Sequence, residues 1–103
     1  MPLLWAKKEV FEWLKIGKKT IDVRKGNPMR GDIAVFTSGP HILKFKILKK
    51  ENGQLGEIIR EDNFGRVIPS AQSVEDAVSY LRGIYRGYDG VFTAYYLGLL
   101  KTL

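Results

Sequence analysis

The chain has 103 residues, a formal net charge of +6, one histidine and no cysteine. This length suits one domain with its own core, and 45% apolar residues with 27% charged residues argue against disorder. The composition excludes disulfides, thiolate metal sites, cysteine nucleophiles and multi-histidine metal sites. We therefore expect a single domain over residues 1–103 that uses no metal or cofactor, and the lack of cysteine is typical of cytoplasmic proteins.

The positive charge is concentrated in the first half of the chain. Residues 1–50 carry twelve basic and four acidic side chains, a net +8, whereas residues 51–103 carry five and seven, a net −2. Such asymmetry suggests an anionic partner such as nucleic acid or a nucleotide. A solvated lysine-rich surface, common in thermophile proteins, would produce the same asymmetry, so charge alone leaves both interpretations open.

The first predicted elements are a short strand and a helix. Residues 1–6 are too few for the core of a signal peptide, and we interpret them as a strand. No apolar run approaches the roughly 20 residues that span a bilayer, so no membrane association is expected. Residues 9–16 place Phe11 and Leu14 at helical spacing, and Gly17 can adopt the left-handed conformation that ends a helix.

A strand with one polar face follows this helix, in the sequence GKKTIDVR. Ile21 and Val23 are predicted to point to one face of a half-buried strand. Thr20, Asp22 and Arg24 are predicted to point to the other face. This polar face is the most informative chemical feature of the sequence.

The remaining chain alternates between turns, strands and helices. Glycine, asparagine and proline mark turns at residues 25–32, 38–40, 52–53 and 87–90. Apolar runs or alternation predict strands over residues 33–37, 42–50 and 91–100. Helices are predicted over residues 54–60 and 73–85, with an irregular stretch at 61–71 between them.

The helix over residues 73–85 has a recognisable start. Ser73-Val-Glu-Asp76 resembles a capping box in which aspartate replaces the usual glutamate or glutamine. The apolar side chains expected on its buried face are Val74, Ala77, Val78, Leu81 and Ile84. Outside this face, Trp5 and Trp13 are interpreted mainly as core or half-buried residues, with base stacking as the alternative, and Tyr85 is interpreted as a core residue.

Five or six strands joined by short connections favour an antiparallel or mixed curled sheet over a parallel one. A small barrel would close such a sheet economically, because closure removes exposed edge strands. The expected fold class is therefore α+β, a small β-barrel flanked by two or three helices.

The polar strand could bind an anion or a base. Alternate residues on one strand face lie about 6.5–7 Å apart, so their side chains can share a ligand. Arg24 offers a planar fork for phosphate or a base edge, and Asp22 can orient that fork or accept from a base amino group. Lys18 and Lys19 could contact phosphate or act as a base if burial lowers their pKa. A surface strand with a structural Asp–Arg pair is the open alternative.

The short helix, GKKTIDVR, a loop and Gly-Asp before an apolar strand together resemble the ASCH domain. The residues that match the family signature are Gly17, Lys19, Thr20, Ile21, Asp22, Arg24, Gly31 and Asp32. The later stretch SVEDAVSYLRGIY, followed by a closing apolar strand, is similar to the family's helix and last strand. The resemblance covers residues 3–100 and implies a PUA-like fold, a small β-barrel flanked by helices.

The resemblance also implies RNA binding in a cleft beside the signature strand. Our leading hypothesis is a binding module for RNA or for a modified nucleoside or nucleotide, in a basic cleft beside residues 19–24. The candidate ligand-binding residues are Lys18, Lys19, Thr20, Asp22, Arg24, Lys25 and Arg30.

Enzymatic members of the family define the alternative hypothesis. One branch removes the acetyl group from N4-acetylcytidine with a lysine, a threonine nucleophile and a glutamate. The lysine matches Lys19, but Asp22 stands at the threonine position and Ser70 near the glutamate position, with Glu61 and Glu75 only loosely nearby. This amidohydrolase activity is therefore disfavoured. A nucleoside- or RNA-directed hydrolase, with Lys19 as base and Asp22 orienting it or a water, stays open, as does a plain interaction domain.

Overall fold

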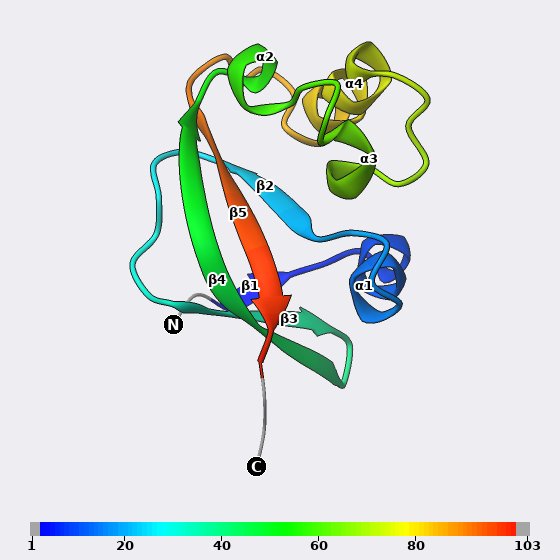
Figure 1. Cartoon of the computed structure of the whole chain (residues 1–103), viewed down its shortest axis with the longest axis vertical. Coiled ribbons are helices and arrows are strands. Elements are labelled where there is room, and N and C mark those ends of the chain that lie inside the picture. Colours follow the sequence, from blue (N-terminus) through cyan, green and yellow to red (C-terminus); the bar gives the residue numbers. More distant parts are fainter. Residues whose placement is uncertain (1–2, 101–103) are drawn as a thin grey trace.

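The computed structural model describes residues 3–100, which form a five-stranded mixed sheet and four helices (Figure 1). The strands are β1 (Leu3–Trp5), β2 (Ile21–Lys25), β3 (Ile33–Ser38), β4 (His41–Gly53) and β5 (Phe92–Leu99). The helices are α1 (Lys8–Lys15), α2 (Leu55–Ile58), α3 (Phe64–Val67) and α4 (Val74–Ile84). The predicted α+β class is confirmed. None of the helices within residues 3–100 is long and apolar enough to cross a membrane.

The sheet curls into a half-barrel. Its strand order is β1-β3-β4-β5-β2, with β1 parallel to β3 and the other neighbouring pairs antiparallel. The long strand β4 pairs with β3 and then with β5, and its register with β5 shifts between Ile47 and Lys49. The two strands at the ends of the order, β1 and β2, do not pair with each other within the described residues. The predicted curl is present, and a seam stays open between β1 and β2.

Strand β5 is buried on both faces. Phe92 and Ala94 belong to one apolar cluster with residues of α2, α3 and α4. Tyr95 and Leu97 belong to a second cluster with residues of α1, β1 and β3. Because side chains alternate along a strand, these two pairs leave β5 on opposite faces. This two-sided burial explains the nearly continuous apolar sequence predicted as the closing strand.

The predicted helix boundaries at Gly17 and Ser73 are confirmed by local geometry. Gly17 follows α1 with a φ of +83°, the left-handed conformation expected at a helix end. The hydroxyl of Ser73, the N-cap of α4, accepts from the backbone N–H of Asp76 at 3.1 Å. The Asp76 carboxylate accepts from the N–H of Gln72 at 3.0 Å, one residue before the position used in a standard capping box. Loss of such a cap typically costs about 1 kcal/mol.

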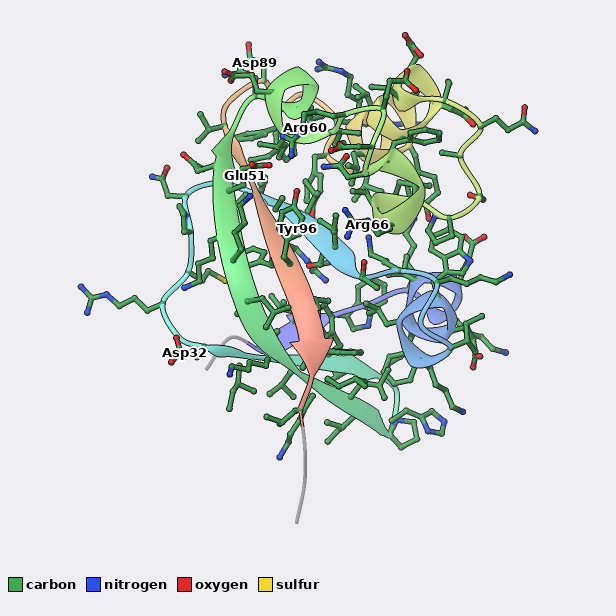
Figure 2. The ribbon with its side chains drawn as sticks, in the orientation of Figure 1. Asp32, Glu51, Arg60, Arg66, Asp89 and Tyr96 are labelled. Carbon is green, nitrogen blue, oxygen red and sulfur yellow. The ribbon has the colours of Figure 1, made fainter. Side chains whose placement is uncertain are left out.

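Arg60 joins the segment after α2 to the sheet (Figure 2). One terminal nitrogen of its guanidinium donates to Glu51 Oε1 at 3.0 Å, and the other donates to the Tyr96 hydroxyl at 3.3 Å. The buried Asn63 donates to the same hydroxyl at 3.2 Å and to the carbonyl of Ile58 at 3.0 Å. These bonds hold α2 and the start of α3 against β4 and β5.

Three predictions of side-chain burial are wrong. Trp5, expected to be core or half-buried, is 65% exposed because it ends the edge strand β1 at the open seam. Ile84, expected on the buried face of α4, is 39% exposed because it lies in the last turn and lines a pocket. The alternation of the predicted strand over residues 42–50 directs Lys50 outward, but the residue is half-buried because its Nζ donates to the carbonyl of Met29 at 2.6 Å. The stretch predicted as irregular also contains the one-turn helix α3.

Tyr95 anchors the loop between β2 and β3, and we expect its hydroxyl to contribute measurably to the stability of the fold. The residue is 1% exposed, and the hydroxyl accepts from the backbone N–H of Met29 at 2.9 Å. Tyr95→Phe keeps the ring but removes this acceptor. We expect the free energy of unfolding in urea to fall by about 1–2 kcal/mol.

Tyr85→Phe serves as the control, because the Tyr85 hydroxyl has no hydrogen-bond partner within residues 3–100. Its effect on the free energy of unfolding should stay below about 0.5 kcal/mol. Equal losses in the two variants would contradict a specific role for the bond to Met29.

Candidate functional site

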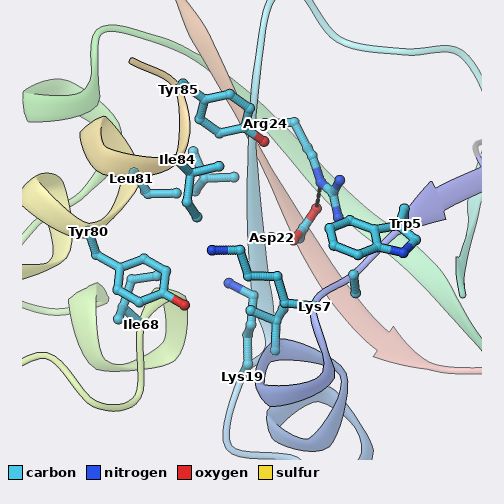
Figure 3. A pocket seen from close by; sticks show the side chains of 13 residues that line it. Trp5, Lys7, Lys19, Asp22, Arg24, Ile68, Tyr80, Leu81, Ile84 and Tyr85 are labelled. Atoms are coloured by element: carbon cyan, nitrogen blue, oxygen red, sulfur yellow. Dashed lines mark hydrogen bonds and ion pairs between the residues drawn. The ribbon is translucent and has the colours of Figure 1, made fainter. Parts of the chain in front are cut away.

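A pocket of about 230 Å³ lies at the open seam of the half-barrel, between α1 and α4 and with β2 as its floor (Figure 3). Both edge strands contribute to it, since Trp5 ends β1 and Asp22, Val23 and Arg24 belong to β2. The lining residues are Trp5, Ala6, Lys7, Val10, Lys19, Asp22, Val23, Arg24, Ile68, Tyr80, Leu81, Ile84 and Tyr85. The pocket is therefore lined by residues from both edge strands of the sheet, β1 and β2.

Lys19 is a buried cation at the floor of the pocket. The residue is 4% exposed, and its Nζ donates to the carbonyls of Ile21, at 2.8 Å, and of Val67. An ammonium group has three N–H donors, so one donor is left after these two bonds. Lys19 thus joins the start of β2 to the end of α3 and retains a donor for a ligand.

Burial lowers the pKa of Lys19 from 10.5 to about 8. The main cause is the loss of hydration, which disfavours the charged form of a buried amine. The carboxylate of Asp22 opposes this shift, and the guanidinium of Arg24 adds to it. Lys19 is therefore mostly protonated at neutral pH but titrates within a range that mild alkali reaches.

Asp22 and Arg24 form an ion pair on the same floor. Arg24 Nε donates to Asp22 Oδ2 at 2.7 Å, and the two side chains are 22% and 5% exposed respectively. The guanidinium carbon also lies 5.9 Å from the centre of the Phe36 ring. These contacts use Nε, while the two terminal nitrogens have no hydrogen-bond acceptor within residues 3–100. A guanidinium held in this way can offer a bidentate edge to phosphate or carboxylate.

The walls of the pocket are aromatic and apolar. Tyr80 and Tyr85 come from α4 and its C-terminal end, and the exposed Trp5 lies across the seam from them. The Tyr80 hydroxyl donates to Glu9 Oε2 at 3.4 Å, which links α4 to α1 beside the pocket. Figure 3 shows the amine of Lys7 reaching into the space between α1 and α4. Flat aromatic surfaces of this kind can stack on bases.

Three of the predicted ligand-binding residues meet at this pocket, namely Lys19, Asp22 and Arg24. The other predicted lysines and arginine, Lys18, Lys25 and Arg30, are exposed and lie outside its lining.

Thr20 lines a different hollow, of about 510 Å³, between the end of α1 and the ends of β4 and β5. Its N–H donates to the carbonyl of Arg66 at 3.1 Å, and its carbonyl accepts from the N–H of Leu97 at 2.9 Å. Regular strand geometry begins only at Ile21, so the alternation predicted for the whole GKKTIDVR segment does not bring Thr20 to the pocket of Asp22. The Thr20 hydroxyl oxygen is buried without a hydrogen-bond partner within residues 3–100.

Sequence reasoning missed several lining residues, above all Lys7, Ile68 and Tyr80. Lys7 has a weak signal, because it precedes the first turn of a predicted helix directly after a predicted strand. Tyr80 and Ile84 share one helix face at a spacing of four residues, which predicts that they face the same neighbour. Neither signal says that this neighbour is β2, since that depends on the strand order.

The residues near the glutamate position of the enzymatic alternative lie away from the pocket. Ser70 is exposed and lines another hollow, and Glu61 and Glu75 are exposed outside the pocket lining. Within residues 3–100, Asp22 is the one carboxylate that lines the pocket, and no cluster of His, Cys, Asp and Glu is suited to a metal ion. Acid–base chemistry in the pocket would therefore depend on Lys19 and Asp22.

The titration of Lys19 should respond in opposite directions to its two charged neighbours. We expect ¹³C NMR of the Lys19 Cε to give a pKa near 8 in the wild type. Asp22→Asn removes the charge that raises this pKa and should lower it further, whereas Arg24→Gln removes a charge that lowers it and should raise it. Lys19→Arg identifies the resonance by its loss. A midpoint that is the same in both variants would contradict this electrostatic arrangement.

No family model matches the sequence, and no curated protein matches it. Solved structures do match the fold. The hypothetical protein PH0355 superposes with a TM-score of 0.76 and 25% sequence identity, covering 95% of this chain and 97% of that chain. Protein PF0455 from Pyrococcus furiosus superposes with a TM-score of 0.69 and 22% identity, covering 98% of each chain.

An ASCH protein from Zymomonas mobilis has the same architecture. It superposes with a TM-score of 0.67 and 17% identity, covering 93% of this chain and 65% of that chain. At this identity the match establishes the fold alone, and it agrees with the resemblance carried by GKKTIDVR. The chain therefore has the α+β, PUA-like fold of ASCH domain proteins, as the sequence predicted.

Proposed function

We propose that this domain is a binding module for RNA or for a modified nucleoside or nucleotide, held in the basic pocket beside residues 19–24. The ASCH-type fold supports RNA as the kind of partner at the level of the fold. The pocket chemistry supports a single nucleotide unit as the part that is bound. We place this binding in the cytoplasm because the chain has no cysteine.

The anchored guanidinium of Arg24 is the observation that carries the proposal. Its Nε is held by Asp22 at 2.7 Å, so a ligand does not have to order the side chain on binding. A phosphate, or a base edge with two acceptors, would satisfy its terminal nitrogens. The second carboxylate oxygen of Asp22 can accept from a base amino group. Aromatic walls on either side suit the flat base itself.

The exposed basic residues near this segment fit a longer RNA. Lys18 and Lys25 lie directly beyond the two ends of the pocket-forming segment, and Arg30 lies in the loop that follows it. In the proposed complex they contact phosphates outside the pocket. Such contacts release counterions, so they strengthen binding most at low salt.

A nucleoside- or RNA-directed hydrolase is the second candidate, and the burial of Lys19 supports it. With a pKa of about 8, a fraction of the amine is neutral near physiological pH and can accept a proton. Asp22 would orient Lys19 or a water. The carbonyl bonds to Lys19 nevertheless favour its charged form, and no serine, threonine or cysteine lines the pocket within residues 3–100. These two points make binding the better-supported function.

RNA binding should depend on salt and on the fork of Arg24. We expect a labelled single-stranded RNA of mixed sequence to bind in fluorescence anisotropy, with the logarithm of the association constant falling linearly with that of the salt concentration. Arg24→Lys keeps the charge but removes the bidentate edge, and should weaken binding about tenfold. Lys46→Gln is the control, because Lys46 is exposed on β4 outside the pocket lining and its loss should weaken binding less.

Two outcomes would count against binding as the function. If RNA does not bind at low salt and no nucleoside or nucleotide shifts the melting temperature, the proposal fails. Turnover of acylated cytidines or labelled RNA that disappears in Lys19→Ala would instead support the hydrolase, and turnover unchanged in that variant would exclude Lys19 as its base.

A further inference from the structure

The charges that line the pocket do not balance. Lys7, Lys19 and Arg24 are cationic and Asp22 is the one anion, while the other lining residues carry no charge. Asp22 is paired with Arg24 at 2.7 Å. The amines of Lys7 and Lys19 have no carboxylate within 4.0 Å among the described residues. With both amines protonated, the pocket holds a formal charge of +2.

We propose that the pocket binds the phosphomonoester group of a nucleotide, either free or at the end of an RNA strand, in preference to a neutral nucleoside. This inference rests on the proposed nucleotide-binding function and specifies the charge of the ligand. A phosphomonoester carries about −1.5 to −2 at pH 7, which matches the excess charge of the pocket. An internal phosphodiester carries a single negative charge and would leave one cation uncompensated between apolar walls.

The donors of the pocket can be shared among the terminal oxygens of one phosphate. Arg24 supplies the two terminal nitrogens of a fixed guanidinium, and Lys19 supplies the N–H that its carbonyl bonds leave over. Lys7 adds a flexible amine from the connection between β1 and α1. Figure 3 shows the amines of Lys7 and Lys19 directed into the same space between α1 and α4. Two segments, the β1–α1 connection and residues 19–24, thus direct three cations toward one small volume.

The size of the pocket suits the phosphate of a nucleotide, and the aromatic side chains at its mouth suit the base. Its volume of about 230 Å³ lies below the range of about 300–1,000 Å³ usual for drug-sized ligands. A phosphate inside it leaves the base near the mouth, where Trp5 is 65% exposed and Tyr85 is half-buried. These rings can stack on any base, so the proposal specifies the phosphate and leaves the base free.

Proton uptake distinguishes the two ligand charges. A dianion beside Lys19 would raise the pKa of the ammonium above its value of about 8, so binding slightly above pH 8 takes up a proton. A neutral nucleoside has no such effect. The charged and titratable groups that line the two hollows beside Lys19 are Asp22 and Arg24 on β2, Lys7 before α1, Tyr80 and Tyr85 from the α4 side, Lys15 on α1 and Lys44 on β4. Glu9 on α1 accepts from the Tyr80 hydroxyl beside the pocket.

Calorimetric titration of the full chain tests this proposal. The probes are the four ribonucleosides, their 5′- and 3′-monophosphates and inorganic phosphate. We expect at least one monophosphate to bind about tenfold more tightly than its nucleoside, with proton uptake seen as a dependence of the heat on the buffer slightly above pH 8. Oligoribonucleotides with phosphorylated or hydroxyl ends show whether the natural ligand is an RNA end or a free nucleotide. If it is an RNA end, strands with a terminal phosphate should bind more tightly than strands with a terminal hydroxyl. If it is a free nucleotide, the two kinds of strand should bind equally.

Matched variants assign the preference to the pocket. Lys7→Gln, an exposed position, should reduce the preference for monophosphate over nucleoside severalfold, whereas Lys46→Gln should leave it unchanged. Lys19→Met should abolish proton uptake. If Lys19→Met does not fold, the reduced preference in Lys7→Gln still tests the proposal. Nucleosides that bind as tightly as their monophosphates would overturn this inference while the proposed function stands. If neither these ligands nor RNA binds, the proposed function itself fails.

Discussion

The buried ammonium of Lys19 is the interaction on which the rest of this structure depends. It bonds the carbonyl of Ile21 at the start of β2 and that of Val67, 48 residues away at the end of α3. Burial of an ion costs several kcal/mol, and the lowered pKa of Lys19 reflects that cost. The carbonyls and the charge of Asp22 offset part of it. An apolar side chain of similar length would avoid this cost, so stability alone does not explain a lysine here.

The pocket and the incomplete barrel are one structural feature. A closed barrel would pair β1 with β2 and leave no edge strand. In this chain α1 and α4 flank the seam instead, and the pocket lies between them. The exposure of Trp5 follows directly, because the neighbour that closure would provide is absent. Lys19 supports this arrangement, since its bond to Val67 fixes the α3–α4 side of the seam to the floor.

The sequence predicted the order of elements well and the shape of the site less well. Alternation of Ile21 and Val23 identified β2, and the resemblance to the family signature indicated the fold and named Lys19 and Asp22 as candidate residues. Alternation describes two faces of one strand, however, and contains no information on what covers them. The burial of Lys19 depends on α3, and the pocket position of Tyr80 depends on how α4 packs against the seam. Both are tertiary contacts between segments far apart in the chain, which local patterns do not encode.

The charge state of Lys19 decides between recognition and catalysis in this pocket. A general base has to be neutral, and burial together with Arg24 moves the amine in that direction. The carbonyls of Ile21 and Val67 act in the opposite sense, because they accept hydrogen bonds that the ammonium donates most strongly. An anion in the pocket would stabilise the ammonium of Lys19 further, because it would relieve the repulsion between Lys19 and Arg24. The bonds that anchor β2 thus hold Lys19 as a donor, which favours anion binding over proton transfer.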